Sequence, residues 1–501
     1  MAMPHILLFS VFVVAACGLA YELVAAALSS YLIGDSVTQF STVIGVYLFA
    51  MGVGSWLSRH VHRDLAGTFI RVELAVGLIG GFSAAMLFWA FVWISGPFLL
   101  LLYLLVFLIG TMVGLEIPLV MRLLEPKLQF KELVSQVLSV DYLGALAVSL
   151  LFPLWLAPKL GMVRTALLFG LLNAGVALWT LWLFRQELPR PRLLWAQGSL
   201  VVALLTAGFI GADKLSSLAE TALYEDSIVL SESTPYQRIV MTRWKDDWRL
   251  FLNNNLQFSS RDEYRYHEAL VHPGLASLPW ARRVLVLGGG DGMAVREILK
   301  YPHIEQITLV ELDPAMPRLF REHPALRKLN GDALNSPRVR IHTTDAFGWL
   351  AQSRESFDFV VVDFPDPSNY AVGKLYTNTF YRLLERNLNA RGRAVIQTTS
   401  PLFARLSFWT VVNTVESVGL LSQPYHAQVP SFGEWGYVLV GREAYTPPSQ
   451  LPAGLRYLSP ASLPGLFHFP PDMARLPSEV NRLNNQILVR TFEQEWKQVL
   501  R

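Results

Sequence analysis

Hydrophobic and polar residues divide this chain into two parts with different patterns. Up to residue 211 the chain consists of long apolar runs separated by short polar loops. A helix needs about 20 apolar residues to cross a bilayer core. Seven runs reach that length, and we therefore expect an α-helical membrane domain of about seven transmembrane helices at 1–211. The runs are 5–29, 38–58, 72–95, 98–121, 134–157, 163–183 and 193–211.

Beyond residue 221 the apolar runs become short. The β-type stretches SIVLSE, QRIVMTRW, WRLFLN and LQF, with a turn signal at 253–255, predict a small antiparallel β domain with a linker helix at 221–280. From 281 to 450 apolar strands alternate with helical segments, which predicts a Rossmann-like α/β domain built on a doubly wound parallel sheet. Residues 451–501 form a C-terminal tail with a helix at 477–499, which could pack on the domain, cover a site or mediate dimerisation.

Composition narrows the classes of protein that fit. An apolar fraction of 52% with 16% charged residues agrees with a membrane part. The net charge of +3 is too small to indicate a nucleic-acid partner. The single cysteine, Cys17, excludes disulfides within the chain.

A glycine-rich segment carries the first chemical signal. The run VLVLGGGDG ends one predicted strand, and the next strand ends at the acids of LVELD. Glycines let a backbone turn tightly beneath a ligand, and an acid ending the following strand can accept both ribose hydroxyl protons. Gly290 precedes Glu311 by 21 positions, close to the spacing of about 20 expected for a ribose-binding acid. The segment predicts a nucleotide-binding domain.

Four acids are expected at one edge of this sheet: Asp291, Glu311, Asp345 and Asp363 all follow predicted strands. Ligands of such sheets bind beyond the carboxyl ends of the strands. Carboxylates held together repel one another unless a positive partner compensates them, so the acids favour a cationic ligand. A metal ion is the rival ligand. Alternatively, one or two of these acids, Asp291 in particular, only cap helices.

The order of several further motifs resembles the spermidine synthase family of aminopropyltransferases. The matching motifs are Tyr236-Gln237 in STPYQRI, Asp262-Glu263 and Tyr266-His267-Glu268 in RDEYRYHEALVH, then GGGDG, LVELD, TTDA, DFPDP and LYTNTFY. The resemblance covers about 227–441, and the apolar front half looks like that of membrane-anchored bacterial relatives. It implies a methyltransferase-type Rossmann-like domain that transfers the aminopropyl group of decarboxylated S-adenosylmethionine to an amine, releasing methylthioadenosine.

The resemblance also implies roles for individual residues. Asp363 is expected to be the catalytic acid, and Asp366, Tyr266 and His267 to bind the acceptor amine. We expect no metal ligand in the site and no tightly bound cofactor, because decarboxylated S-adenosylmethionine acts as a co-substrate. The residues expected to bind this nucleoside are Gln237, Gln257, Gly288, Gly290, Asp291, Glu311, Asp345 and Ala346.

Departures from the family pattern affect the acceptor side. Asn253-Asn254 stand where Asp-Gly is frequent, Phe364-Pro365 separate Asp363 from Asp366, and Phe432 replaces a tyrosine. Putrescine is the expected acceptor, with agmatine, cadaverine or a longer polyamine as alternatives. The family also implies a homodimer, and the apolar runs imply the lipid bilayer as a partner. A methyltransferase using intact S-adenosylmethionine, or a non-catalytic polyamine sensor or transporter, is the alternative function.

The charges of the loops indicate on which side of the membrane each part of the chain lies. Basic residues concentrate in alternate loops, nine against Lys159 and Arg164, which is the bias of cytoplasmic loops. With seven spans this bias places everything after Gly211 outside the cell. Because the nucleoside is made in the cytosol, we nevertheless expect a cytoplasmic catalytic part of an inner-membrane protein. The nine residues are Arg59, Arg63, Arg71, Arg122, Lys127, Lys131, Arg185, Arg190 and Arg192.

Four acids fall within or at the ends of the apolar runs: Glu22, Glu73, Glu116 and Asp141. Carboxylates inside a membrane usually face a bundle interior or a wet cavity. They could form a path or sensor for a cationic polyamine, or they could only hydrogen-bond neighbouring helices.

Overall fold

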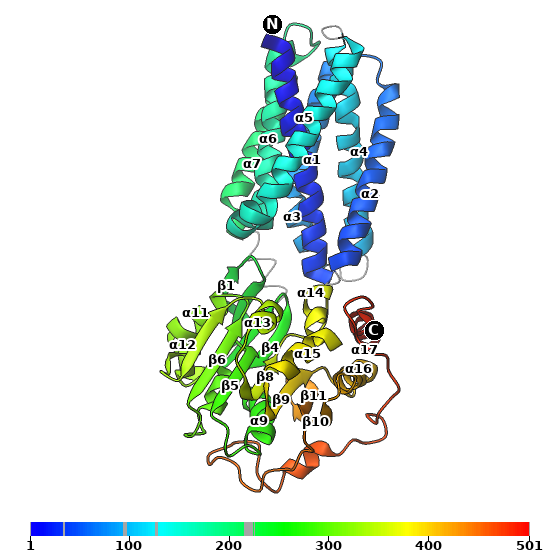
Figure 1. Cartoon of the computed structure of the whole chain (residues 1–501). Helices are drawn as coiled ribbons and strands as arrows, with labels where there is room; N and C mark the ends of the chain where they lie inside the picture. Colours follow the sequence, from blue (N-terminus) through cyan, green and yellow to red (C-terminus); the bar gives the residue numbers. More distant parts are fainter. Residues whose placement is uncertain are drawn as a thin grey trace. The chain divides into compact units, whose positions relative to one another are not determined.

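The computed structural model describes residues 2–33, 36–93, 98–125, 129–214, 224 and 226–499. Lys127, the start of the expected β domain at 221–223 and the last residues of the tail, 500–501, lie outside them. The chain divides into two compact units, Met1–Ile228 and Val229–Arg501. The first is helical, and the second contains nearly all of the β structure (Figure 1).

The helical unit contains the apolar elements expected from the sequence. Among the described residues, six continuous helical stretches are long and apolar enough to cross a membrane, and one of them, Lys131–Phe184, has 54 residues. That stretch would be about 80 Å long if straight, but Gly161 with φ of 74° divides it into two helices joined by a π-helical segment, Phe152–Leu160. The helices are α1 (Ala2–Ile33), α2 (Ser36–Leu57), α3 (Leu65–Trp93), α4 (Phe98–Leu124), α5 (Phe130–Leu151), α6 (Gly161–Phe184) and α7 (Pro191–Ile210).

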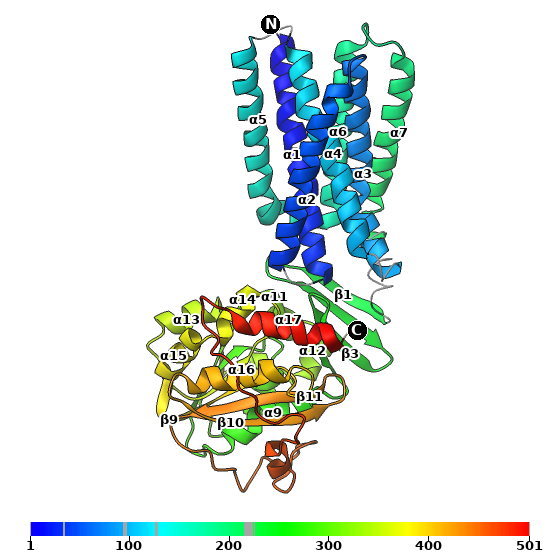
Figure 2. The same cartoon turned by 90° about the vertical axis from the view of Figure 1, so that its right-hand side faces the viewer.

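Close helix packing in this unit depends on glycine. Helix α1 contacts α2 to α6 and so forms the centre of the bundle (Figure 2). Between α2 and α4, a Cβ at Gly54 would lie 2.0 Å from the carbonyl oxygen of Thr111, and one at Gly114 would lie 2.2 Å from that of Met51. Small residues that bring backbones together in this way are typical of membrane helices.

The small sheet begins the second part of the chain. Its order is β1-β2-β3-β4, and the β2–β3 and β3–β4 pairs are antiparallel. Asn253 and Asn254 have φ of 48° and 67°, as the tight turn predicted there requires. The strands are β1 (Ser227–Ser233), β2 (Arg238–Trp244), β3 (Asp247–Leu252) and β4 (Asn255–Ser259).

The large sheet has the order β10-β11-β9-β8-β5-β6-β7. From β7 to β9 neighbouring strands are parallel, as predicted. The chain runs from β5 outward to β7 and then returns to β8 on the other side of β5, which opens a crevice at the carboxyl ends of β5 and β8. The strands are β5 (Arg283–Gly288), β6 (Gln306–Glu311), β7 (Val339–Thr343), β8 (Phe357–Asp363), β9 (Leu388–Thr398), β10 (Leu421–Val429) and β11 (Gly433–Gly441).

The prediction of a wholly parallel sheet was wrong at one edge. Strand β11 is antiparallel to both β9 and β10. Only residues 430–432 separate β10 from β11, and so short a connection can join only antiparallel strands. Strand β10 was not predicted; it contains Pro424, which an edge strand tolerates although a central strand does not.

Helices cover the strands of the large sheet. Helix α9 contacts β8 to β11, and α17 contacts α16, where the Glu495 carboxylate accepts hydrogen bonds from the backbone N–H of Leu406 at 2.7 Å and of Ser407 at 3.0 Å. The tail therefore packs on the domain, although its helix begins at Ile487 rather than at 477. The helices are α9 (Glu263–Leu275), α10 (Met293–Ile298), α11 (Ala315–Glu322), α12 (Pro324–Leu329), α13 (Ala346–Gln352), α14 (Tyr370–Gly373), α15 (Asn378–Arg386), α16 (Arg405–Glu416) and α17 (Ile487–Val499).

Candidate active site

The glycine loop after β5 lies directly against the end of β8. Gly288 pairs with Asp363 across the two strands. Gly288 has φ of 80°, and a Cβ there would lie 2.2 Å from the Asp363 carbonyl oxygen. At Gly289 a Cβ would lie 3.0 Å from Asp363 Oδ2. The glycines are thus required because Asp363 occupies the space that side chains would need.

Asp363 ends β8 and is held by a tyrosine from α9. The Tyr266 hydroxyl donates a hydrogen bond to Asp363 Oδ1 at 2.6 Å. Burial raises the pKa of Asp363 to about 6, although the charge of His267 and the bond from Tyr266 lower it. This carboxylate is therefore partly protonated near neutral pH and can exchange a proton with a ligand.

His267 is tied to a neighbouring acid. Its Nδ1 lies 2.8 Å from Glu263 Oε2, and Arg296 holds both oxygens of the same carboxylate at 2.9 Å. Burial acts to lower the pKa of His267, but the bond to Glu263 and the charges of Asp291 and Asp363 raise it above its ordinary value. His267 is thus biased toward the protonated form, which suits a charged partner of the acids better than a base.

Asp366 lies in a loop pinned from three elements. The Tyr376 hydroxyl donates to the Pro365 carbonyl at 3.1 Å, Gln397 donates to the Phe364 carbonyl, and Trp435 Nε1 donates to Gln397 Oε1 at 3.0 Å. Burial raises the pKa of Asp366 to about 7. Its Oδ1 is buried and has no hydrogen-bond partner among the described residues, so it is available to a ligand donor.

Glu311, at the end of β6, faces the glycine loop. Its carboxylate accepts hydrogen bonds from the backbone N–H of Gly290 at 3.1 Å and of Asp313 at 3.0 Å. A Cβ at Gly290 would lie 2.7 Å from Glu311 Oε2, so glycine is needed there too. Burial raises the pKa of Glu311 to about 7, which leaves it able to take up or release a proton at neutral pH.

Asp291 makes the capping contact considered above. Its Oδ1 accepts a hydrogen bond from the Met293 N–H at 2.9 Å, at the start of α10. Burial raises the pKa of Asp291, while the charge of His267 lowers it. Asp291 therefore orients the helix start, and its charge also acts on His267 and Asp363.

The two glutamines assigned to the nucleoside side occupy different surroundings. Gln237 Nε2 donates to Asp313 Oδ2 at 3.0 Å, which attaches it to the loop after Glu311. Gln257 Nε2 instead donates to the Asn255 carbonyl at 3.1 Å. Within residues 226–499 no hydrogen bond joins Gln257 to the acids, whereas Gln237 is bonded to Asp313.

Asp345 is engaged on both oxygens. One accepts from the Gly348 N–H at 3.1 Å, which caps α13 just before the buried Ala346, and the other forms an ion pair with Lys374 Nζ at 3.0 Å. Lys374 stands in the stretch KLYTNTFY, but nothing in the sequence indicated this pairing. A ligand that binds Asp345 would share it with Lys374.

The structure thus groups most of the predicted site residues around the switch point of the sheet. Hydrogen bonds and electrostatic interactions link four of them: Tyr266, His267, Asp291 and Asp363. The loops after β5 and β6 add three more, which are Gly290, Glu311 and Gln237. Among the described residues no group of three or more His, Cys, Asp or Glu side chains is placed to hold a metal ion. The residues that sequence reasoning missed are Asp313, Tyr376, Gln397, Trp435 and Lys374.

A Rossmann-like sheet with an acidic rim defines a broad class of nucleoside-using enzymes. Comparison with known proteins identifies the family within this class. Residues 263–448 match the Spermine/spermidine synthase domain. Polyamine aminopropyltransferase 2 of Ralstonia nicotianae is 56% identical over 505 residues, covering 99% of each chain. Polyamine aminopropyltransferase of Leptospira interrogans is 52% identical over 498 residues, covering 99% of this chain and 100% of its own.

A crystal structure of spermidine synthase with the transition-state analogue AdoDATO is also similar, at 23% identity and a TM-score of 0.46, covering 48% of this chain and 85% of that one. On the strength of the two full-length relatives, the chain belongs to the spermidine synthase family. It is a polyamine aminopropyltransferase.

Proposed function

We propose that the enzyme transfers the aminopropyl group of decarboxylated S-adenosylmethionine to putrescine, giving spermidine and methylthioadenosine. The observation that carries this proposal is the pair Tyr266–Asp363 at 2.6 Å, set at the switch point beside Asp291 and opposite the glycine loop. An acidic crevice of this kind attracts a sulfonium donor and an ammonium acceptor together.

Donor binding assigns separate tasks to the acids. Glu311 accepts the ribose hydroxyl protons once its contacts with the loop backbone adjust, and Asp345 with Ala346 binds the adenine. Asp291 faces the aminopropyl end. Its negative charge opposes the carboxylate of intact S-adenosylmethionine, which supplies discrimination by like-charge repulsion.

Transfer requires a free amine lone pair. A primary amine has a pKa near 10.4 and is mostly protonated at neutral pH. Asp363, with a pKa of about 6, accepts or relays the proton that the acceptor nitrogen loses. The nitrogen then attacks the aminopropyl carbon as the carbon–sulfur bond breaks, and the electron pair of that bond leaves with sulfur as a neutral thioether. Asp366 holds the other ammonium of the acceptor.

The test is methylthioadenosine release by the purified full-length chain. With decarboxylated S-adenosylmethionine, putrescine should give faster release than agmatine, cadaverine or spermidine. Asp363→Asn should abolish transfer while donor binding changes little, and Asp472→Asn, an exposed acid of the tail, serves as the matched control. Formation of S-adenosylhomocysteine would indicate the methyltransferase alternative, and binding without turnover would indicate a sensor or transporter.

We further propose that the helical unit spans the inner membrane and that the catalytic unit is cytoplasmic. Support comes from the six apolar helical stretches and from large apolar side chains that face outward, such as Phe49 and Leu100, which are 67% and 71% exposed. The cytosolic origin of the nucleoside favours the cytoplasmic side, against the loop-charge bias. Reporter fusions at the C-terminus test this: a reporter active only outside the cytoplasm would place the catalytic unit externally.

A further inference from the structure

The interior of the helical unit contains acids that catalysis does not use. Glu73 on α3 and Glu116 on α4 are 0% and 1% exposed. Asn173 on α6 donates a hydrogen bond from Nδ2 to Glu73 Oε2 at 2.8 Å, and its Oδ1 accepts one from the Tyr21 hydroxyl at 3.5 Å. Four helices, α1, α3, α4 and α6, therefore contribute to one polar cluster inside an apolar bundle.

The cluster leaves hydrogen-bonding capacity unused. Both carboxylate oxygens of Glu116 and Oε1 of Glu73 are buried without a hydrogen-bond partner among the described residues. Ionised acids would need a positive partner there, and protonated acids would need an acceptor for each O–H. In either protonation state the described residues leave these three oxygens available to a group from outside the chain.

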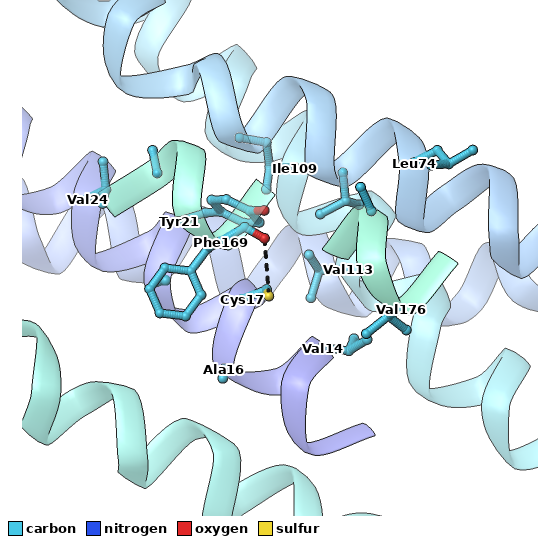
Figure 3. Close-up of a cluster of buried hydrophobic side chains, with 14 of the residues drawn as sticks. Val14, Ala16, Cys17, Tyr21, Val24, Leu74, Ile109, Val113, Phe169 and Val176 are labelled. Atoms are coloured by element: carbon cyan, nitrogen blue, oxygen red, sulfur yellow. Dashed lines mark hydrogen bonds between the residues drawn. The ribbon is translucent and has the colours of Figure 1, made fainter. Parts of the chain in front are cut away.

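The surroundings of the cluster indicate the charge of that group. When ionised, Glu73 acts electrostatically on Glu116, and both act on Tyr21 and Cys17 of α1. Figure 3 shows Cys17 and Tyr21 in this core beside Ile109 and Val113, which precede Glu116 on α4. No Lys, Arg or His is buried in the described part of the helical unit. An ionised Glu73 or Glu116 would therefore need a cation from outside these helices.

A small cavity borders Tyr21 of the cluster, although Glu73, Glu116 and Asn173 do not line it. A cavity of about 10 Å³ is lined by Tyr21, Glu22, Tyr47 and Ser83 together with apolar residues. That volume accommodates roughly one water-sized group. The head of an alkylammonium ion is of this size, whereas a hydrated metal ion is larger.

We propose that Glu73 and Glu116, with Asn173 and Tyr21, form a binding site for the primary ammonium end of a polyamine within the helical unit. A primary ammonium carries three N–H donors, and the cluster offers three unpartnered oxygens. A water molecule has two donors and no charge, so it satisfies the cluster less well. The choice of spermidine as ligand rests on the proposed function, because spermidine is its product.

Binding of radiolabelled spermidine to the detergent-solubilised full chain, measured by equilibrium dialysis without donor, tests the site. The wild-type chain should bind one spermidine more than the Glu73→Gln/Glu116→Gln variant, and methylthioadenosine release should be the same in both. Glu116→Asp, which keeps the charge, should retain the additional site. Glu132→Gln, at an exposed acid of α5, is the matched control and should bind as the wild type does.

A second measurement needs no variant. A hydrophobic carbodiimide should label Glu73 or Glu116, read by peptide mass spectrometry, and spermidine should reduce that labelling at least fivefold relative to sodium chloride of equal ionic strength. Equal stoichiometry in wild type and double variant, or labelling unaffected by spermidine, would overturn the site and indicate bound water only. Absence of methylthioadenosine release with the additional binding intact would overturn the catalytic proposal and leave the site standing.

Discussion

Replacing Tyr266 by phenylalanine isolates the contribution of one hydrogen bond to Asp363, the proposed catalytic acid. The ring packing of Tyr266 against His267, Phe432 and Tyr437 is retained, and only the 2.6 Å donor to Asp363 is lost. Hydrogen bonds to charged groups contribute about 1.5–3 kcal/mol. One pKa unit corresponds to about 1.4 kcal/mol, so the pKa of Asp363 should rise by roughly one to two units.

This shift predicts a defect that depends on pH. From a value of about 6, the pKa of Asp363 would move to roughly 7–8. The ionised fraction at pH 7 then falls from about nine-tenths to between one-half and one-tenth, so kcat/KM should fall about two- to tenfold there and recover near pH 9. The ratio of variant to wild-type kcat/KM should be measured from pH 6 to 9. Titration of the amine affects both enzymes equally, so its effect cancels in this ratio.

Tyr425→Phe is the matched control for this experiment. The Tyr425 hydroxyl is buried and donates to the Ala269 carbonyl at 2.8 Å instead of to Asp363. Its loss should leave the pH dependence of kcat/KM unchanged. A Tyr266→Phe ratio that stays constant across pH would refute the argument, because the hydroxyl would then act on ligand placement and not on the carboxylate.

Three further predictions follow from the same site. Asp291→Asn should lower the preference for decarboxylated over intact S-adenosylmethionine at least tenfold, measured by competition for binding; unchanged preference would contradict charge exclusion. Gly288→Ala should lower the thermal unfolding temperature and abolish activity, since its φ of 80° and the 2.2 Å approach to the Asp363 carbonyl oxygen leave no room for a Cβ; a variant as stable as wild type would contradict the close packing. Burial raises the pKa of Glu311 from 4.5 to about 7. Between about pH 4.5 and 7, the folded state therefore keeps a proton on Glu311 that the unfolded state has already released. Stability of the ligand-free enzyme should therefore fall as pH rises through that window, and Glu311→Gln should flatten the decline; an equal slope in both would contradict it.

The sequence predicted those features of the fold that depend on neighbouring residues. Continuous apolar runs predicted β5, β6 and β8, because strands buried on both faces need no alternation of apolar and polar residues. Acids at the ends of those strands could be assigned to one rim, since parallel strands end on the same edge. Asn253 and Asn254 could be assigned to a turn because asparagine tolerates positive φ.

Features that depend on residues distant in sequence could not be predicted. Lys374 pairs with Asp345 from 29 positions away, and Trp435 reaches the Asp366 loop only through Gln397. Each contact joins elements whose proximity follows from the sheet order, and the reversed direction of β11 was not predicted. Similarly, the contact between Glu495 of α17 and the start of α16 depends on the path of the tail, which no local pattern specifies.

The position of the switch point in the sheet has an evolutionary consequence. Glu311, Asp345 and the glycine loop come from the segment 283–346, whereas Asp366, Gln397 and Trp435 come from 363–435. Under the proposed assignment, these two stretches encode most of donor recognition and most of amine recognition in turn, while Gln237 on the donor side and Tyr266 and His267 on the acceptor side precede both. Descendants of this enzyme can then acquire a new amine through changes in the second stretch and in α9, while the first stretch stays constant with the shared nucleoside.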